Sequence, residues 1–249
     1  MSQLEKVYGR LTDSARKATL MVAFMRRFDE NYDDAHTKVK AGAIGKPTIF
    51  RSHQADCGNV NDSMYYDYLR TCGGIFIDSV IHDIDLSLMF LGEDSVPKSV
   101  SAVGTAAIFT DLAETGDADN AVGVCEYWGG KIANFFLSRT SKHGYDNETQ
   151  IWGPDGKVAV NSVPRKNRVE LSTTSGVQFD ACPTWYDRYV PAFVNEVNAW
   201  VDAVLDGKPM PVPLSSSLKS MVIAEALQES LRTGKKINFS EDGKRLLLE

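Results

Sequence analysis

The stretch G-G-I-F-I-D-S-V-I-H-D-I-D-L, from Gly73 to Leu86, combines two turn-forming glycines with a helical pattern of apolar and ionisable side chains. A helix that begins near Asp78 would place one apolar stripe against a core. That stripe contains Ile77, Ile81, Ile84 and Leu88. A neighbouring polar stripe contains Asp78, His82 and Asp85 at positions i, i+4 and i+7. The stretch therefore predicts a helix that packs on a core and presents an acid and an imidazole beside it.

The spacing of Asp78 and His82 has two interpretations. An imidazole with an ordinary pKa titrates near neutrality, where a general acid or base is most useful, and the preceding glycines let backbone approach a ligand closely. In that interpretation the two residues form half of an active site. In the other, Asp78 caps the helix and His82 is a half-buried histidine whose hydrogen bonds are satisfied.

Composition predicts one soluble domain with a substantial core. The chain has 249 residues, of which 43% are hydrophobic and 24% are charged, and its formal net charge is −6. This acidic balance argues against nucleic-acid binding, which requires a basic patch. No apolar run approaches the roughly 20 residues of a membrane span. The first residues, M-S-Q-L-E-K, lack an apolar signal core, so a cytoplasmic location is expected.

The cysteines and histidines give no indication of cross-links or of a metal site. The four cysteines form no C-x-x-C pair, and the four histidines are scattered along the chain. We therefore expect neither a disulfide framework nor a zinc ion.

The predicted elements are helical at both ends of the chain and rich in strands between them. Helices are predicted at 29–41, in the Gly73 stretch, at 185–205 and at 215–233, the last with a serine cap and Gly234 as its stop. Residues 56–72 are predicted to be a polar, tyrosine-bearing loop. Strands are predicted at 47–53, 100–109, 121–127, 131–138, 148–152, 157–161 and 168–173. Hairpin signals between some of these strands favour an α+β domain with a large, mostly antiparallel sheet.

Further motifs follow one another along the chain. They are V-A-F-M-R-R-F-D at 22–29, A-G-A-I-G-K-P at 41–47, G-G-x-x-x-D-x-x-x-H-D-I-D from Gly73, K-H-G-Y-D at 142–146 and W-G-P-D-G-K-V at 152–158. R-Y-V-P-A-F-V-N-E-V from Arg188 and A-E-A-L-Q-E-S-L-R-T-G-K from Ala224 complete the pattern. In this order they resemble the glucose-fructose oxidoreductase / inositol dehydrogenase / MocA family, and within it the inositol 2-dehydrogenase branch most closely. The resemblance spans nearly the whole chain.

The resemblance implies a two-domain enzyme of which this chain would lack one half. In such enzymes an N-terminal Rossmann half binds NAD or NADP through a strand, a G-x-G-x-x-G turn and a helix, and no such segment occurs here. We expect residues 1–25 to be a remnant of that half, with a helix and then a strand at 19–24. Residues 26–240 are expected to be the substrate and oligomerisation domain, and 241–249 a tail. The E-K-P lysine of the family has no match either, because Lys6 is followed by valine.

The resemblance also assigns site residues. It implies that His82 takes or gives the proton of the substrate hydroxyl and that Asp78 orients the substrate beside it. Arg26 and Tyr145 match further substrate-contacting positions. A structural salt bridge is the alternative for Arg26, and a core tyrosine is the alternative for Tyr145.

Two positions depart from the inositol dehydrogenase pattern. Gln54 and Asp56 stand where those enzymes carry a histidine and an asparagine, and the loop before Gly73 is longer here. We therefore expect both residues to contact substrate, but to recognise a different pattern of hydroxyl groups.

The resemblance further implies a sheet with helices on one face and self-association through the other. An apolar sheet face exposed to water is unfavourable, so a homodimer or homotetramer is expected. Aromatic side chains in the strand region are compatible with such a face, and packing inside the domain is the alternative for them. They are Phe109, Tyr127, Trp128, Phe135 and Phe136.

Three functional hypotheses follow from these observations. In the first, the chain is the polyol- or sugar-binding domain of an oxidoreductase; it binds no cofactor alone, and hydride transfer with NAD or NADP requires a nucleotide-binding partner. In the second, it is a cofactor-free isomerase, dehydratase or cyclase in which His82 and Asp78 move protons of an oxygenated small molecule. In the third, it is a non-enzymatic oligomeric scaffold. The joint presence of Asp78, His82 and Tyr145 favours ligand chemistry over a bare scaffold.

Overall fold

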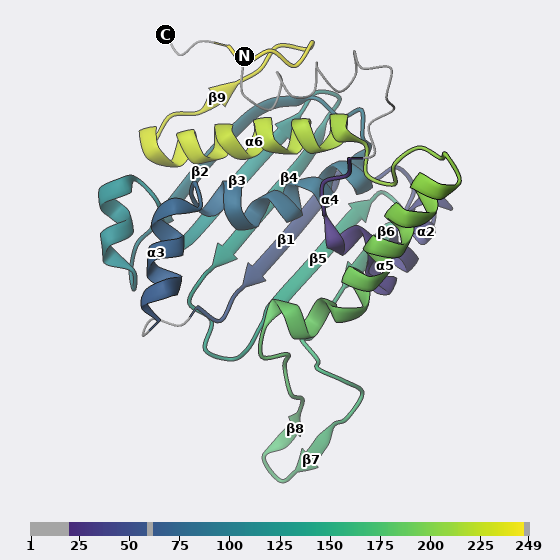
Figure 1. The fold of residues 1–249 in the computed structure, drawn as a ribbon, viewed down its shortest axis with the longest axis vertical. Coiled ribbons are helices and arrows are strands. Elements are labelled where there is room, and N and C mark those ends of the chain that lie inside the picture. The colour runs from purple at the N-terminus through teal and green to yellow at the C-terminus, as the bar shows by residue number, and fades with distance from the viewer. Residues whose placement is uncertain (1–19, 59–61, 247–249) are drawn as a thin grey trace.

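One large sheet organises the domain. The computed structural model describes residues 20–58 and 62–246 (Figure 1). Within these residues the sheet has seven strands in the order β6-β5-β1-β4-β3-β2-β9. Their bounds are Ile49–Ala55 (β1), Pro97–Thr105 (β2), Asn120–Tyr127 (β3), Lys131–Ser138 (β4), Asp146–Gly153 (β5), Gly156–Val160 (β6) and Ile237–Asn238 (β9). Strands β1 and β4 are parallel and the other neighbouring pairs are antiparallel, which confirms the predicted α+β class.

Helices cover one face of this sheet, as predicted (Figure 1). Their bounds are Met25–Phe28 (η1), Glu30–Lys40 (α2), Ser63–Thr71 (α3), Phe76–Val80 (η2), Ile81–Leu91 (α4), Thr110–Thr115 (η3), Trp185–Leu205 (α5) and Leu214–Thr233 (α6). Helix α4 contacts β1 and β4 in the middle of the sheet, α6 contacts β2, and α5 contacts η1. A two-stranded arm, β7 (Leu171–Thr173) and β8 (Gly176–Gln178), extends from one end of the domain.

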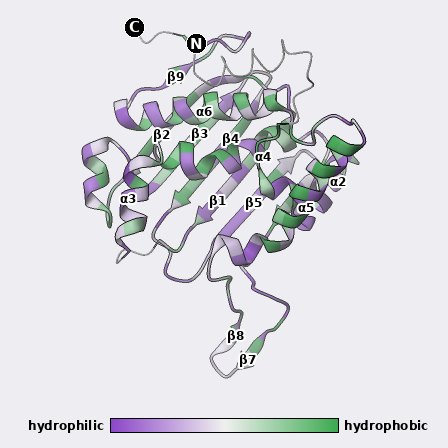
Figure 2. Cartoon of the chain, in the orientation of Figure 1, coloured by the Kyte–Doolittle hydropathy of each residue, from purple (hydrophilic) through white to green (hydrophobic). Residues whose placement is uncertain are grey.

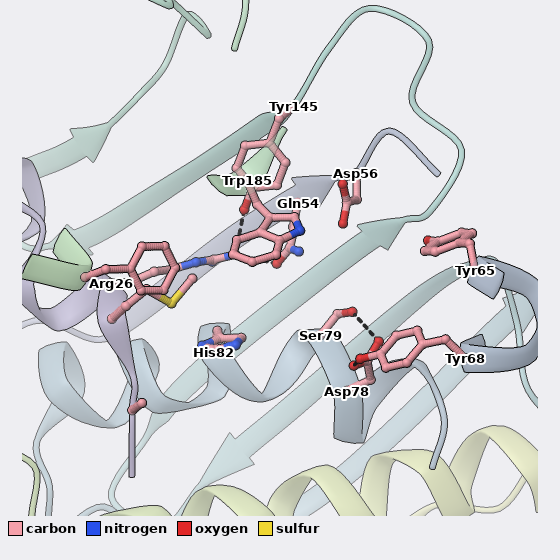
Figure 3. Close-up of a pocket in the computed structure, with 13 residues that line it drawn as sticks. Arg26, Gln54, Asp56, Tyr65, Tyr68, Asp78, Ser79, His82, Tyr145 and Trp185 are labelled. Atoms are coloured by element: carbon pink, nitrogen blue, oxygen red, sulfur yellow. Dashed lines mark hydrogen bonds between the residues drawn. The ribbon is translucent and has the colours of Figure 1, made fainter. Parts of the chain in front are cut away.

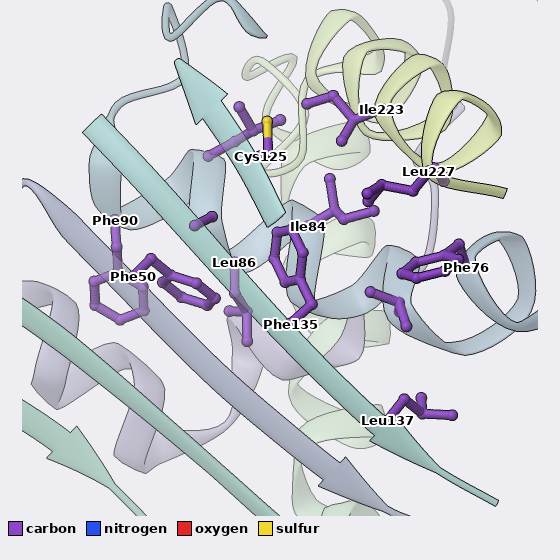
Figure 4. Packing of buried hydrophobic residues seen from close by; sticks show 14 of the residues in the cluster. Phe50, Phe76, Ile84, Leu86, Phe90, Cys125, Phe135, Leu137, Ile223 and Leu227 are labelled. Atoms are coloured by element: carbon purple, nitrogen blue, oxygen red, sulfur yellow. The ribbon is translucent and has the colours of Figure 1, made fainter. Parts of the chain in front are cut away.

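The core lies between the sheet and helix α4. The predicted apolar stripe faces it, since Ile84 and Leu88 are fully buried and the remaining two isoleucines of the stripe pack against it. From the sheet, Phe50 and Phe135 place their ring centroids 6.2 Å apart, near Leu86 of α4 (Figure 4). Strands β3 and β4 are mainly hydrophobic, whereas β1 and β5 carry many hydrophilic residues (Figure 2). The hydrophilic strands are the ones that lead into the site described below.

The opposite face of the sheet, called here the open face, carries exposed apolar side chains. They are Ile49, Val103, Val122, Val124, Ile132, Phe136 and Trp152. Several are cross-strand partners: Trp152, Ile49 and Ile132 form one short row across β5, β1 and β4, and Val122 and Phe136 form another across β3 and β4. Of the aromatic residues considered for this face, Phe109, Tyr127 and Phe135 are buried inside the domain and Phe136 is on the open face.

The predicted loop at 56–72 is wrong, because it contains helix α3. Asp62 caps this helix by accepting two hydrogen bonds from backbone N–H groups of its first turn. Leu69 then packs with Phe109 and Leu112 in a small cluster that is separate from the main core. The helix is therefore stabilised by contacts that lie some 40 residues away in the sequence, which a local pattern does not reveal.

Among the other boundaries that differ from the prediction, two have a clear local cause. The strand expected at 100–109 ends at Thr105, because the Asp119 carboxylate accepts hydrogen bonds from three successive backbone N–H groups at 107–109 and bends the chain. Helix α6 has no serine cap, since Pro213 precedes its first turn without any side-chain hydrogen bond. Its predicted end is confirmed, with Gly234 in the left-handed conformation.

The predicted remnant at 1–25 is only partly within the described residues. Residues 1–19 lie outside them, and with them the expected helix. Residues 20–24 form no strand, because no described strand lies alongside to pair with them, and they lead directly into η1. At the other end, residues 241–246 of the predicted tail return to the domain through a β-bridge between Phe239 and Arg245.

Candidate active site

The Gly73 stretch and several distant segments meet around one cavity of about 460 Å³ (Figure 3). This volume is in the range of small-molecule sites. The cavity brings together all six residues that the sequence analysis assigned to a site: Arg26, Gln54, Asp56, Asp78, His82 and Tyr145. Ala23, Met25, Tyr65, Tyr68, Ser79, Trp185 and Phe193 complete its lining.

A glycine turn directs the chain into the cavity. Gly74 has φ of 117°, and a Cβ atom there would lie 2.3 Å from the side chain of Gln228. The backbone N–H of Ile75 donates to Asp117 at 2.9 Å, and that of Phe76 donates to Gln228 at 3.1 Å. The helix therefore begins with η2, a π-helical turn at Phe76, and not near Asp78 as predicted.

The Asp78 carboxylate is held in one orientation and does not cap a helix. Its Oδ2 accepts hydrogen bonds from Ser79 Oγ at 3.0 Å and from Arg139 Nη2 at 3.2 Å, while the Tyr68 hydroxyl donates to Oδ1. Arg139 is almost fully buried and also pairs with Asp117 at 3.0 Å. Asp78 is thus an oriented hydrogen-bond acceptor at the cavity wall.

His82 is a neutral imidazole at pH 7. Its ring lies edge-on to Phe24 with centroids 5.7 Å apart, and its Nδ1 has no hydrogen-bond partner among the described residues. Burial, with a further contribution from the charge of Arg26, lowers the pKa of His82 to about 3. The structural interpretation of the motif expected a half-buried histidine with satisfied hydrogen bonds. His82 is half-buried, but its Nδ1 lacks the hydrogen bond that this interpretation requires. A neutral imidazole beside a cavity is able to accept a proton.

Arg26 forms the structural salt bridge that the sequence analysis gave as one alternative, and it also lines the cavity. Its Nη1 forms a buried ion pair with Asp83 at 2.8 Å. Its Nη2 donates to Gln54 Oε1 and, at 3.1 Å, to the Tyr145 hydroxyl. Arg26 therefore orients two other cavity residues while its own charge is balanced.

Tyr145 is likewise a core tyrosine with a polar role. It is 2% exposed, and its ring meets Tyr189 edge-on with centroids 6.2 Å apart. Burial raises the pKa of the Tyr145 hydroxyl well above its usual range, so the group is a neutral hydrogen-bonding group at the cavity.

Asp85 lies outside the cavity, although the sequence placed it on the same stripe as Asp78 and His82. It accepts hydrogen bonds from Arg27 Nε at 2.6 Å and Nη2 at 2.7 Å. Burial raises the pKa of Asp85 to about 6, and Arg27 opposes that shift. Arg26 therefore pairs with Asp83 and Arg27 pairs with Asp85. These two ion pairs hold η1 against α4.

Asp56 differs from the other charged groups of the cavity. Its Oδ1 accepts a hydrogen bond from the backbone N–H of Cys57 at 2.8 Å, and it forms no ion pair with any described residue. Its carboxylate points into the space between Gln54 and Tyr65 (Figure 3). Burial raises the pKa of Asp56, and the nearby charge of Asp78 adds to that effect.

Sequence reasoning missed the aromatic side of the cavity. Tyr65 and Tyr68 come from helix α3, and Trp185 and Phe193 come from the first turns of α5. The cluster M-Y-Y-D-Y at 64–68 was a usable signal, because three tyrosines in a polar segment are unusual for a solvated loop.

The described residues do not fit a nucleotide cofactor. The parallel strands β1 and β4 are not joined by a glycine-rich turn that opens a helix, and no described segment has the G-x-G-x-x-G pattern.

Within the described residues no helix is both long and apolar enough to cross a membrane.

Comparisons with known proteins agree on one family. The model of the GFO/IDH/MocA C-terminal domain matches residues 32–159, more than half of the chain. The chain is 31% identical to the uncharacterized oxidoreductase YrbE of Bacillus subtilis over 91% of its length, and 30% identical to scyllo-inositol 2-dehydrogenase (NAD(+)) of the same organism over 86%. It covers only 64% and 60% of those two relatives.

A solved structure is similar as well. It is scyllo-inositol dehydrogenase from Lactobacillus casei with bound cofactor NAD(H) and scyllo-inositol, with a TM-score of 0.86 and 27% identity. The similarity covers 95% of this chain and 70% of that one.

Proposed function

The chain belongs to the GFO/IDH/MocA family, and on that premise we propose that it is the substrate domain of an NAD-dependent dehydrogenase of inositols or related polyols. The observation that carries the proposal is the pairing, in one cavity, of a neutral imidazole with an oriented carboxylate, His82 and Asp78. The names of the relatives supply the substrate class.

His82 and Asp78 have different roles at the substrate. His82 is the residue we assign to the hydroxyl proton, which it accepts on its neutral ring; burial and the charge of Arg26 make it a weak base in the free chain, with a pKa of about 3. Asp78, fixed by Arg139 and Ser79, accepts a hydrogen bond from a neighbouring hydroxyl and sets the orientation of the ring. Gln54 and Tyr145, both held by Arg26, bind further hydroxyls on the opposite wall.

The hydride acceptor is NAD or NADP held by a nucleotide-binding unit that is not among the described residues. The described residues include no Rossmann-type glycine-rich turn that would hold it. In this proposal the chain binds and deprotonates the polyol, and the redox step requires that unit.

Self-association through the open face is part of the proposal. Cross-strand pairs join Ile132 to Ile49 and Ile49 to Trp152, and Val122 faces Phe136 on the next strand. All five are at least 37% exposed in one copy. Apolar rows of this kind are buried when two copies pack face to face, which stabilises a homodimer.

Isothermal titration of the chain with scyllo-inositol and myo-inositol tests the proposal. We expect one of them to bind, and Asp78→Asn and His82→Gln to weaken that binding by about ten-fold or more, which is about 1.4 kcal/mol. His36→Gln is the matched control, because His36 is a half-buried histidine on α2 outside the cavity. Binding that is unchanged in both cavity variants would remove the assignment.

The same samples distinguish the cofactor-free alternative. We incubate the chain with each polyol without nucleotide and follow the polyol by NMR. Conversion that depends on His82 would favour an isomerase or dehydratase, whereas an unchanged spectrum together with binding fits a substrate domain.

A further inference from the structure

Asp56 is the one charge of the cavity lining that lacks an ion-pair partner among the described residues. Arg26 pairs with Asp83, and Asp78 pairs with Arg139, at 2.8 and 3.2 Å. Asp56 accepts a single backbone hydrogen bond and has no such cation. Asp56 is half-buried, and burial of a carboxylate without a cation beside it is unfavourable, so its presence calls for a reason.

The surroundings of Asp56 add negative charge to the cavity. Arg139 is shared between Asp78 and Asp117, so one cation faces two carboxylates on that side. His82 contributes no charge, because its pKa is about 3. The pocket therefore carries an excess of negative charge. Among its carboxylates, that of Asp56 points into the cavity (Figure 3).

Aromatic rings border the same space. Tyr65, Tyr68 and Trp185 line the cavity. Tyr65 and Asp56 line the same cavity, and after burial the Asp56 charge contributes to the raised pKa of the Tyr65 hydroxyl. A carboxylate in a cavity lined by aromatic rings is the combination that binds an ammonium group, through an ion pair and cation–π attraction.

We propose that Asp56 recognises an ammonium group, so that the preferred substrate is an amino-bearing cyclitol or sugar. This inference rests on the proposed polyol function and narrows its substrate class. In Figure 3, Asp56 lies across the cavity from Asp78 and His82. The ammonium group therefore binds at the end remote from the reacting hydroxyl and takes no part in the proton transfer.

The test compares two ligands that differ by one group. Scyllo-inositol and 1-amino-1-deoxy-scyllo-inositol are titrated calorimetrically into the full chain at pH 7. We expect the amine to bind about ten- to hundred-fold more tightly, since a hydrogen bond between charged groups is worth about 1.5–3 kcal/mol. Equal or weaker binding of the amine would overturn the inference and leave the polyol proposal standing.

Substitution of Asp56 tests whether this residue causes the preference for the amine over scyllo-inositol. Asp56→Asn keeps the shape and removes the charge, so the ratio of the two affinities should fall toward one, whatever the variant does to the binding of scyllo-inositol itself. Asp34→Asn on α2 is the control, because Asp34 is exposed and outside the cavity, and it should leave the preference intact. A preference that survives Asp56→Asn contradicts the assignment.

The wild-type comparison needs no variant, so it remains decisive if Asp56→Asn does not fold. Binding of the amine alone would support the inference and exclude neutral inositols as substrates. Binding of scyllo-inositol alone overturns only the inference. Binding of neither ligand overturns the inference, and it overturns the polyol proposal as well when myo-inositol also fails to bind.

Discussion

His82 makes the stability of the domain depend on pH. In the folded chain its pKa is about 3, against an ordinary value of 6.5, so below pH 6.5 the unfolded chain binds one proton more than the folded chain. This contribution to stability is complete above pH 6.5 and is lost as the pH falls toward 3, at up to about 1.4 kcal/mol per pH unit.

We therefore expect His82→Gln to flatten the loss of stability in acid. Urea unfolding of both proteins at pH 7, 6, 5 and 4 measures the free energy of unfolding. The two curves should run parallel above pH 6.5 and converge below it as the wild type loses stability faster. Curves that stay parallel down to pH 4 would show that the imidazole is not buried in its neutral form.

Glu196 titrates in the opposite sense. This residue of α5 is 6% exposed, and its Oε1 has no hydrogen-bond partner among the described residues. Burial raises its pKa from 4.5 to about 7. The folded chain therefore binds the extra proton between these values, and the associated stability is lost as the pH rises through 7.

Glu196→Gln replaces the carboxyl with a neutral group of the same shape. We expect it to raise the melting temperature at pH 8 and to change it little at pH 5, as measured by circular dichroism. Glu225→Gln, at an exposed position of α6, is the control and should have little effect at either pH. A stabilisation of equal size at both pH values would point to a cause other than titration.

At the scale of elements, the turn before η2 is the most sensitive point. Gly74→Ala places a Cβ atom against the Gln228 side chain. The backbone at Gly74 also has a conformation that L-residues rarely adopt, so we expect the free energy of unfolding to fall by roughly 3 kcal/mol or more. Gly42→Ala is the matched control, because Gly42 has φ of 82° but no atom within 4 Å of the new Cβ. Its loss should be about 1–2 kcal/mol.

Chemical denaturation and inositol titration of both glycine variants check this expectation. The Gly74 variant should also bind polyol less tightly, because the turn positions Asp78 and Ser79. Similar losses of stability in the two variants would mean that Gln228 moves aside at little cost.

The sequence predicted most elements because they follow local periodicity. Helix α5 has the predicted bounds, 185–205, and strands β3 to β6 differ from prediction by two residues at most. The failures arise from interactions between distant residues. Helix α3 needs Phe109 and Leu112, and the early end of β2 needs the Asp119 carboxylate. No local pattern contains those partners.

At the scale of the whole molecule, the open face is expected to control assembly. Val122→Lys places a charge in the middle of the apolar rows, and we expect it to convert a dimer or larger assembly to monomers, as measured by sedimentation velocity. Val177→Lys on the β8 strand of the arm is the control, because Val177 is also exposed but lies off this face. A wild-type chain that is monomeric at high concentration would contradict the proposal.

The sequence predicted which residues line the site but not the contacts that hold them. Six residues that the family pattern picked out do meet in one cavity, although they are spread over 120 positions of the chain. The sequence did not show that Arg26 pairs with Asp83 or that Arg139 holds Asp78. Such pairs depend on how η1, α4 and β4 pack together, and that geometry is not encoded in any one segment.

The parallel pairing of β1 with β4 has a consequence for the order of synthesis. Strand β1 sits between β4 and β5, which follow it by roughly 80 and 100 residues, so at the ribosome it emerges long before either neighbour exists. Until residue 138 is available, β1 has neither of its neighbouring strands, and its second neighbour, β5, is complete only at residue 153. The nascent chain therefore completes its pocket late, because the lining also needs Trp185 and Phe193 of α5, and Phe50 stays without its buried surroundings until the sheet has formed.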